Sequence, residues 1–177
     1  MRVLVVYESM FGNTQQIAKA IAKGLASYGQ VDIVEVGDAS TVEPRNGHDL
    51  LVVGGPTHGL GLSRPGTREA AANQAANGVV SRRIGLREWL EVAETPRQVP
   101  TATFDTRLDK PRWLVGSAAR GVAKRLRRYG GRLVVAPESF LVKGTPGPLR
   151  DGEVERARRW GAALGAKRAS ELQKQPS

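Results

Sequence analysis

Apolar runs of strand length alternate with segments of helical period along this chain. Residues 3–7 form a continuous, β-branched apolar run, and residues 14–28 then repeat apolar side chains at helical spacing up to Gly29. Further apolar runs at 50–54 and 99–104 are each followed by a segment that favours helix. A wholly apolar strand is typical of a parallel sheet that is covered on both faces. The alternation predicts a doubly wound α/β fold with a five-stranded parallel sheet and helices on both faces.

The remaining elements of this fold are less regular in sequence. Residues 31–36 and 132–135 predict the second and fifth strands, and the fifth can continue as an extended arm through 138–142. The polar segment 37–49 is compatible with a loop or with a short helix. Further helices are expected at residues 64–77, 86–93, 113–129 and 153–169.

The chain length of 177 residues fits one domain, which we place over residues 1–171, with a flexible tail over 172–177. Cysteine is absent, which excludes disulfides, thiolate metal sites and cysteine nucleophiles. No apolar stretch is long enough to span a bilayer and no cleavable leader is recognisable. We therefore expect neither secretion nor membrane insertion, and a cytoplasmic location.

The net charge of +10 is distributed unevenly. Residues 1–60 contain four Lys/Arg against six Asp/Glu, so the positive excess lies in the later residues. It is densest over 107–132, where Asp109 is the single acidic residue. This stretch is either a solvated helix face or a docking surface, and an anionic lipid or nucleic acid could also meet it. No aromatic-interleaved motif of a nucleic-acid module is present, so specific nucleic-acid binding is not expected.

The first predicted turn, residues 9–14, runs from a strand directly into a helix. It is rich in hydroxyl and amide groups and has no Lys or Arg. Backbone N–H groups at the start of a helix bind phosphate well, and Gly12 would let the backbone close around such a group. A helix cap with a tight turn explains the same residues without a ligand. The turn alone does not decide between the two interpretations.

The sequence Ser-Met-Phe-Gly-Asn-Thr after the first strand, continued by Gln-Gln-Ile-Ala, resembles the FMN phosphate loop of the flavodoxin family. It matches neither the dinucleotide-binding glycine motif nor the P-loop. The resemblance extends over nearly the whole chain, and the ending is similar to that of single-domain, short-chain flavodoxin-like proteins of bacteria. It implies non-covalently bound FMN whose phosphate contacts Ser9, Met10, Phe11, Gly12, Asn13 and Thr14.

In flavodoxins two further loops contact the isoalloxazine ring, and the resemblance implies the same here. Gly59 is then the point at which a peptide can reorient to hydrogen-bond N5 of the reduced flavin. Many flavodoxins place a Trp and a Tyr in these loops, and neither occurs here, so the ring faces are more open or are covered by His58 and residues near Leu60. A plain Gly/Pro loop remains the alternative for the second loop. The implied ring contacts are Pro56, Thr57, His58, Gly59, Phe104, Asp105, Thr106 and Arg107.

Three functions from different classes are compatible with these features. The first is an electron carrier that exchanges electrons with a redox partner protein, whose docking surface should be acidic because this chain is basic. The alternative is an FMN-dependent oxidoreductase of the quinone or protoporphyrinogen type, and the third is a flavin-free interaction domain. No catalytic residue is assigned, and neither His48 nor His58 has the neighbours of a metal site. The carrier is the preferred hypothesis, and enzymatic activity stays open.

Overall fold

The computed structural model describes residues 1–39, 47–75, 78–92 and 99–174. The strands lie in the order β2-β1-β3-β4-β5, and β6 pairs with β4. Every pairing in the sheet is parallel, which confirms the predicted doubly wound α/β fold. The strands are β1 (Arg2–Tyr7), β2 (Gln30–Glu35), β3 (Leu50–Pro56), β4 (Pro100–Leu108), β5 (Arg132–Leu133) and β6 (Glu138–Val142).

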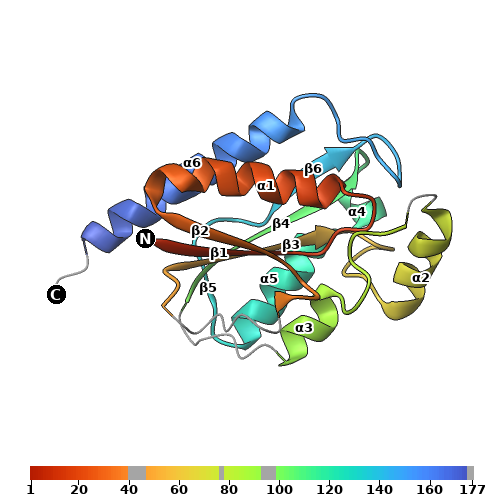
Figure 1. Ribbon diagram of the computed structural model, residues 1–177, viewed down its shortest axis with the longest axis horizontal. Helices are drawn as coiled ribbons and strands as arrows, with labels where there is room; N and C mark the ends of the chain where they lie inside the picture. Colours follow the sequence, from red (N-terminus) through yellow and green to blue (C-terminus); the bar gives the residue numbers. More distant parts are fainter. Residues whose placement is uncertain (40–46, 76–77, 93–98, 175–177) are drawn as a thin grey trace.

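The helices cover the sheet on both faces, with α1 and α6 on one face and α3 and α5 on the other (Figure 1). The short α2 stands beyond the carboxyl ends of the central strands (Figure 1). The helices are α1 (Asn13–Leu25), the 3₁₀ turn η1 (Ala26–Tyr28), α2 (Pro65–Gln74), α3 (Leu86–Val92), α4 (Arg112–Val115), α5 (Ala118–Arg128) and α6 (Glu153–Gln173).

The core is divided by the sheet into two apolar layers, and β1 contributes to both. Val3 and Val5 belong to the layer under α1 and α6, whereas Leu4 and Val6 belong to the layer under α3 and α5. Successive side chains of a strand point to opposite faces, so a run that is apolar throughout fills both layers. This is the physical reason why residues 3–7 could be identified as a central parallel strand.

The fifth strand is divided into two pieces. β5 pairs with the first residues of β4, and β6 pairs with Phe104–Leu108 at its other end. The strand expected over 132–135 therefore ends at Leu133, while the extended arm expected over 138–142 is a strand of the sheet.

The single helix predicted over 113–129 is wrong, because the structure contains α4 and α5 separated by Gly116 and Ser117. Gly116 has φ +72°, and a Cβ built on it would lie 2.0 Å from the carbonyl oxygen of Leu60. The break is caused by this close approach of a distant loop, and Ser117 then caps α5 by accepting a hydrogen bond from the Arg120 backbone N–H.

The other boundaries differ by a few residues. α6 continues to Gln173, so the tail expected from residue 172 begins inside the helix, and residues 175–177 lie outside the described part. Most of the segment 37–49 and the end of the helix expected over 64–77 also lie outside the described residues. Within the described ranges, no helix is long and apolar enough to cross a membrane.

Candidate functional site

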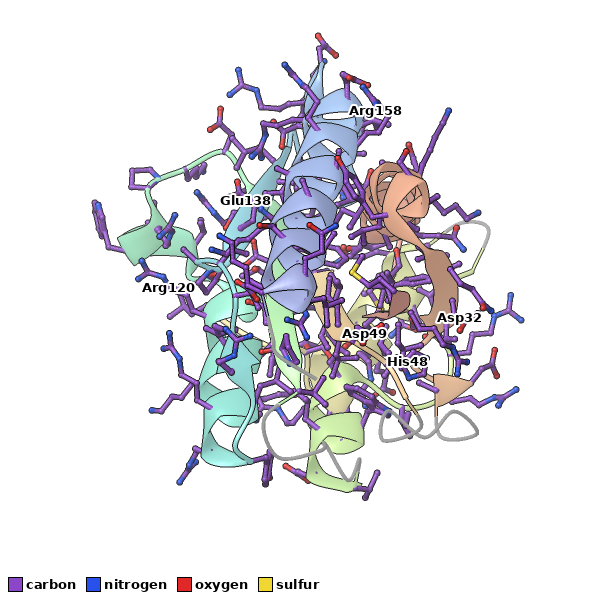
Figure 2. The ribbon with its side chains drawn as sticks, turned by 90° about the vertical axis from the view of Figure 1, so that its left-hand side faces the viewer. Asp32, His48, Asp49, Arg120, Glu138 and Arg158 are labelled. Atoms are coloured by element: carbon purple, nitrogen blue, oxygen red, sulfur yellow. The ribbon has the colours of Figure 1, made fainter. Side chains whose placement is uncertain are left out.

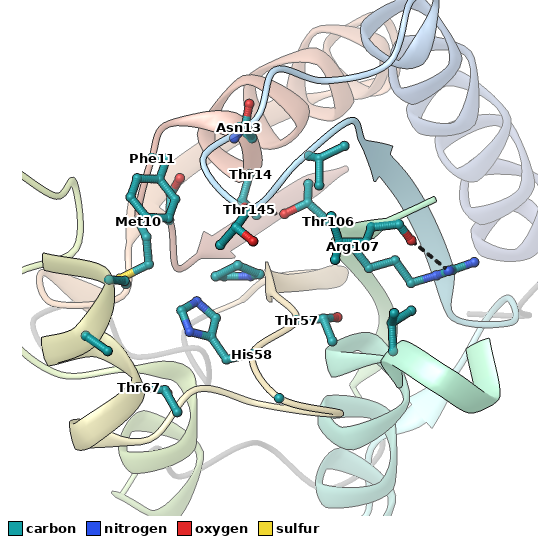
Figure 3. A pocket seen from close by; sticks show the side chains of 18 of the residues that line it. Met10, Phe11, Asn13, Thr14, Thr57, His58, Thr67, Thr106, Arg107 and Thr145 are labelled. Carbon is teal, nitrogen blue, oxygen red and sulfur yellow. Dashed lines mark hydrogen bonds between the residues drawn. The ribbon is translucent and has the colours of Figure 1, made fainter. Parts of the chain in front are cut away.

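A cavity of about 400 Å³ lies at the carboxyl ends of β1, β3 and β4 (Figure 3). In doubly wound sheets this is the edge at which ligands bind, near the position where the strand order reverses. The volume lies within the range of small-molecule and cofactor sites. The cavity is lined by the loops after β1 and β3, by the end of β4, by one face of α2 and by α4.

The loop after β1 ends in a helix start that has no side-chain cap. Gly12 occupies the N-cap position of α1 with φ +85°, a conformation that favours glycine, and a Cβ there would meet no neighbour. The Ser9 hydroxyl accepts a hydrogen bond from the Gln15 backbone N–H at 3.3 Å. The first backbone N–H groups of a helix have no partner within the helix. Ser9 therefore caps one of these N–H groups, whereas the N-cap residue Gly12 has no side chain that could cap the others.

Two side chains of this loop anchor it to the rest of the site. The Thr14 hydroxyl is 2.7 Å from the Thr106 hydroxyl, which ties the loop to β4. The Asn13 side-chain amide donates to the Pro146 carbonyl at 3.0 Å, which ties it to the segment after β6. Thr145 of that segment lines the cavity. Sequence reasoning missed this contribution, because residues 143–152 carried no signal beyond a turn-rich composition.

The second loop is a tight hairpin. His58 and Gly61 exchange two backbone hydrogen bonds of 2.8 and 3.1 Å, and both residues between them have positive φ: +46° at Gly59 and +74° at Leu60. Two positive φ values are those of a type I′ turn. Leucine rarely adopts this conformation, which typically costs about 1–3 kcal/mol. Leu60 is 63 % exposed and lines the cavity, so an apolar side chain is held in a strained position beside it.

His58 is the one histidine in the lining of the cavity among the described residues. Burial lowers the pKa of its imidazole below the ordinary value, and the positive charge of Arg68 lowers that pKa further. Figure 3 shows the imidazole on the cavity side of the loop. A neutral ring at this position can pack against a flat ligand.

The third predicted loop needs a correction, because Phe104 and Asp105 do not line the cavity. Phe104 is fully buried and packs edge-on against Phe140, with ring centroids 6.3 Å apart. Asp105 is fully buried on the opposite face, beside the start of α5. The expected strand ends at residue 104, but β4 continues to Leu108, so these two side chains lie inside the strand. Thr106 and Arg107 do line the cavity.

The structure places the remaining predicted site residues around this one cavity, except Gly12, which lies at the start of α1 and is not part of the lining. The structure adds residues that no sequence pattern singled out, from the inner face of α2, from α4 and from the strand ends. Predicted residues in the lining are Ser9, Met10, Phe11, Asn13, Thr14, Pro56, Thr57, His58, Gly59, Thr106 and Arg107, together with Leu60, near which the sequence suggested a cover for the ring; the added ones are Thr67, Ala70, Ala71, Gln74, Leu108, Leu114, Val115, Val142 and Thr145.

Comparison with known proteins agrees with this geometry. Residues 5–71 match the family model described as Flavodoxin. A flavodoxin from the domain Archaea aligns over 95 % of this chain and 99 % of its own, with 21 % identity and a TM-score of 0.67. A WrbA-like protein from Agrobacterium tumefaciens aligns over 96 % and 98 %, with 17 % identity and a TM-score of 0.63.

The flavodiiron protein from Giardia intestinalis is similar over 98 % of this chain but 37 % of its own, with 18 % identity and a TM-score of 0.65. No curated protein matches the sequence. At these identities the solved structures establish the fold. The residues that match the family model, 5–71, include the loops after β1 and β3 that line the cavity.

Proposed function

We propose, from the match of residues 5–71 to the flavodoxin family model and from the flavodoxin-like fold, that this chain binds FMN in the cavity and transfers electrons to a redox partner protein. Flavodoxins are FMN-binding electron-transfer proteins. The observation that carries the proposal is the glycine-capped start of α1, which follows directly on a loop that lines the cavity at the carboxyl end of β1.

The residues present fit the phosphate of FMN. A helix N-terminus attracts an anion through its backbone N–H groups and its dipole, and Gly12 leaves that end without a side chain. Ser9, Asn13 and Thr14 would surround the phosphate from the same loop. Because this loop has no Lys or Arg, the phosphate would be held mainly by neutral donors.

The second and third loops fit the flavin ring. Thr57 and His58 would lie along one side, and Thr106 and Arg107 along the other (Figure 3). Pro56 lines the same cavity. When bound, the flavin supplies the one-electron and two-electron chemistry, whereas the protein binds it and orients it. The Gly59–Leu60 peptide would adjust beside N5, because glycine accepts several backbone conformations at low cost.

Calorimetric titration with FMN and riboflavin tests this proposal. FMN should bind more tightly than riboflavin, and Gly12→Val should weaken FMN binding by about tenfold while riboflavin binding changes little. Gly152→Val is the matched control, since Gly152 is the N-cap of α6 with φ +82° and ψ −10°, against +85° and −10° at Gly12. Equal affinity for the two flavins contradicts the phosphate assignment, and no flavin binding at all would favour an interaction domain.

The partner we propose has an acidic docking surface, and the support is the charge of α5. This helix contains five Lys or Arg residues, and no ion pair in the described part of the chain involves any of them. Unpaired surface cations attract an acidic partner and accelerate its association. The cytoplasmic location stays a prediction from the sequence.

A second candidate is an FMN-dependent oxidoreductase, with a quinone or a protoporphyrinogen-type substrate. It is favoured by the open mouth of the cavity, where Leu60 is 63 % and Leu114 is 50 % exposed, and by a described lining that contains neither Trp nor Tyr. A substrate could then stack on an uncovered ring face. Turnover of NAD(P)H with a quinone by the FMN-loaded protein would support the enzyme, and reduction without multiple turnover would support the carrier.

A further inference from the structure

A buried carboxylate beneath the second loop joins that loop to the start of α5. We propose that Asp105 is a positioning residue that clamps the hairpin 57–61 in place without touching the cavity. The flavin arm of the test below rests on the proposed function, whereas the hydrogen-exchange arm does not.

The clamp consists of three hydrogen bonds to one carboxylate oxygen. Oδ2 of Asp105 accepts from the Ser117 hydroxyl at 2.6 Å, from the Ala119 backbone N–H at 2.9 Å and from the Thr57 hydroxyl at 3.2 Å. The Thr57 hydroxyl also accepts from the Ala118 backbone N–H at 2.9 Å. Because this hydroxyl donates in one direction and accepts in another, its orientation is determined from both sides.

Capping of α5 does not by itself account for Asp105. Ser117 already serves as the N-cap, since its hydroxyl accepts from the Arg120 backbone N–H at 3.3 Å. Asp105 is fully buried, and its Oδ1 has no hydrogen-bond partner among the described residues. A buried carboxylate with an unpartnered oxygen is costly even at a favourable helix terminus. What the carboxylate adds beyond the cap is the bond to Thr57.

A second contact holds the other end of the same hairpin. Leu60 forms a parallel bridge with Gly116, and the backbones approach so closely that a Cβ on Gly116 would lie 2.0 Å from the Leu60 carbonyl oxygen. The hairpin is thus attached to residues 116–119 at Thr57 and at the strained Leu60. These two attachments, one of which runs through Asp105, therefore fix the position of the hairpin that forms this wall of the cavity.

Hydrogen–deuterium exchange of the flavin-free protein tests the clamp directly. In Asp105→Asn and in Thr57→Val, the backbone N–H groups of His58 and Gly61 should exchange about tenfold faster than in the wild type, because the hairpin loses one of its two attachments. Thr103→Val is the matched control, since Thr103 is fully buried on the same strand and face and its hydroxyl also has no partner. Unchanged exchange at His58 and Gly61 in Asp105→Asn overturns the proposal.

The second arm of the test measures the affinity for riboflavin of Asp105→Asn, of Thr57→Val and of the double variant, as a double-mutant cycle. Each single variant should raise the Kd of riboflavin by about tenfold, and the double variant should also raise it by about tenfold, because both changes break the same link. Thr57→Ser, which keeps the hydroxyl, should raise the Kd of riboflavin less than Thr57→Val does. Independent effects that multiply to about a hundredfold, or a lower Tm with unchanged affinity, would show that Asp105 only stabilises α5. A wild type that binds no flavin contradicts the proposed function, and the exchange data then decide the clamp alone.

Discussion

Helices α5 and α6 contain the same number of positive residues, five each, but use them differently. Each cation of α6 forms an ion pair with Glu138, Glu153, Glu155 or Glu171. α5 has no acidic residue, and no described ion pair involves it. The two helices lie on opposite faces of the sheet, and Figure 2 shows Arg120 on α5 far from Arg158 on α6.

The two helices also differ in how they pack. Gly24 of α1 and Gly161 of α6 let the two backbones meet, since a Cβ on Gly161 would lie 2.3 Å from the Ile21 carbonyl oxygen. At Gly121 of α5 the packing is looser, because a Cβ there would lie 3.5 Å from the Leu62 side chain, an ordinary van der Waals distance. The charges and the packing of α6 therefore serve the fold, whereas the charges of α5 are available to other molecules. Four changes test this contrast.

The largest effect is expected from Gly161→Ala in α6. The new methyl group has backbone atoms of α1 as neighbours, so the two helices must separate, and we expect a loss of about 2–3 kcal/mol in the free energy of unfolding. Urea denaturation measures this loss. A loss below about 0.5 kcal/mol would mean that the helices shift apart easily and that α6 is no more rigidly packed than α5.

Arg156→Met should have the next largest effect on stability. The guanidinium of Arg156 pairs with Glu138 and Glu153 and lies 4.4 Å from the centre of the Phe140 ring. Its removal leaves two carboxylates without their cation, and because the side chain is partly exposed we expect a loss of about 1–2 kcal/mol. Lys124→Met in α5 is the control, with a change within about 0.5 kcal/mol. Similar losses in both variants would remove the distinction between the helices.

Reversing two charges on α5 or two on α6 distinguishes a docking surface on α5 from an effect of the total charge of the protein. Arg127→Glu with Arg128→Glu in α5 should slow association with an acidic redox protein by about tenfold at low salt, because unpaired cations steer the encounter. Arg158→Glu with Arg159→Glu in α6 changes the net charge equally and should have a much smaller effect. Stopped-flow rates at rising salt measure both, and the difference should shrink as the Debye length falls to about 8 Å. Equal slowing by the two pairs would show that only the total charge matters.

Gly121→Ala in α5 should give the smallest effect, with the opposite sign to Gly161→Ala. The methyl group meets Leu62 at an ordinary contact distance, and alanine favours helix over glycine. We expect the free energy of unfolding to rise by about 0.5–1 kcal/mol, measured by urea denaturation. Destabilisation would indicate that α5 is packed as closely as α6.

The sequence by itself determined the parallel α/β architecture and the position of the first site loop. The apolar run over residues 3–7 and the helical spacing over residues 14–28 can be recognised within contiguous stretches of sequence. Side-chain periodicity and a glycine that ends a helix are local properties. The lack of acidic residues in α5 is equally visible in the sequence. The contacts of the site residues with FMN stay a prediction.

The tertiary structure alone decided the features that depend on partners distant in sequence. Leu60 breaks the helix expected over 113–129 by approaching Gly116, and the pairing of β6 extends β4 to Leu108. That extension moved Asp105 from the expected ring contact to a buried position under Thr57. In each case the deciding interaction joins residues more than thirty positions apart, and local periodicity contains no information about such a meeting.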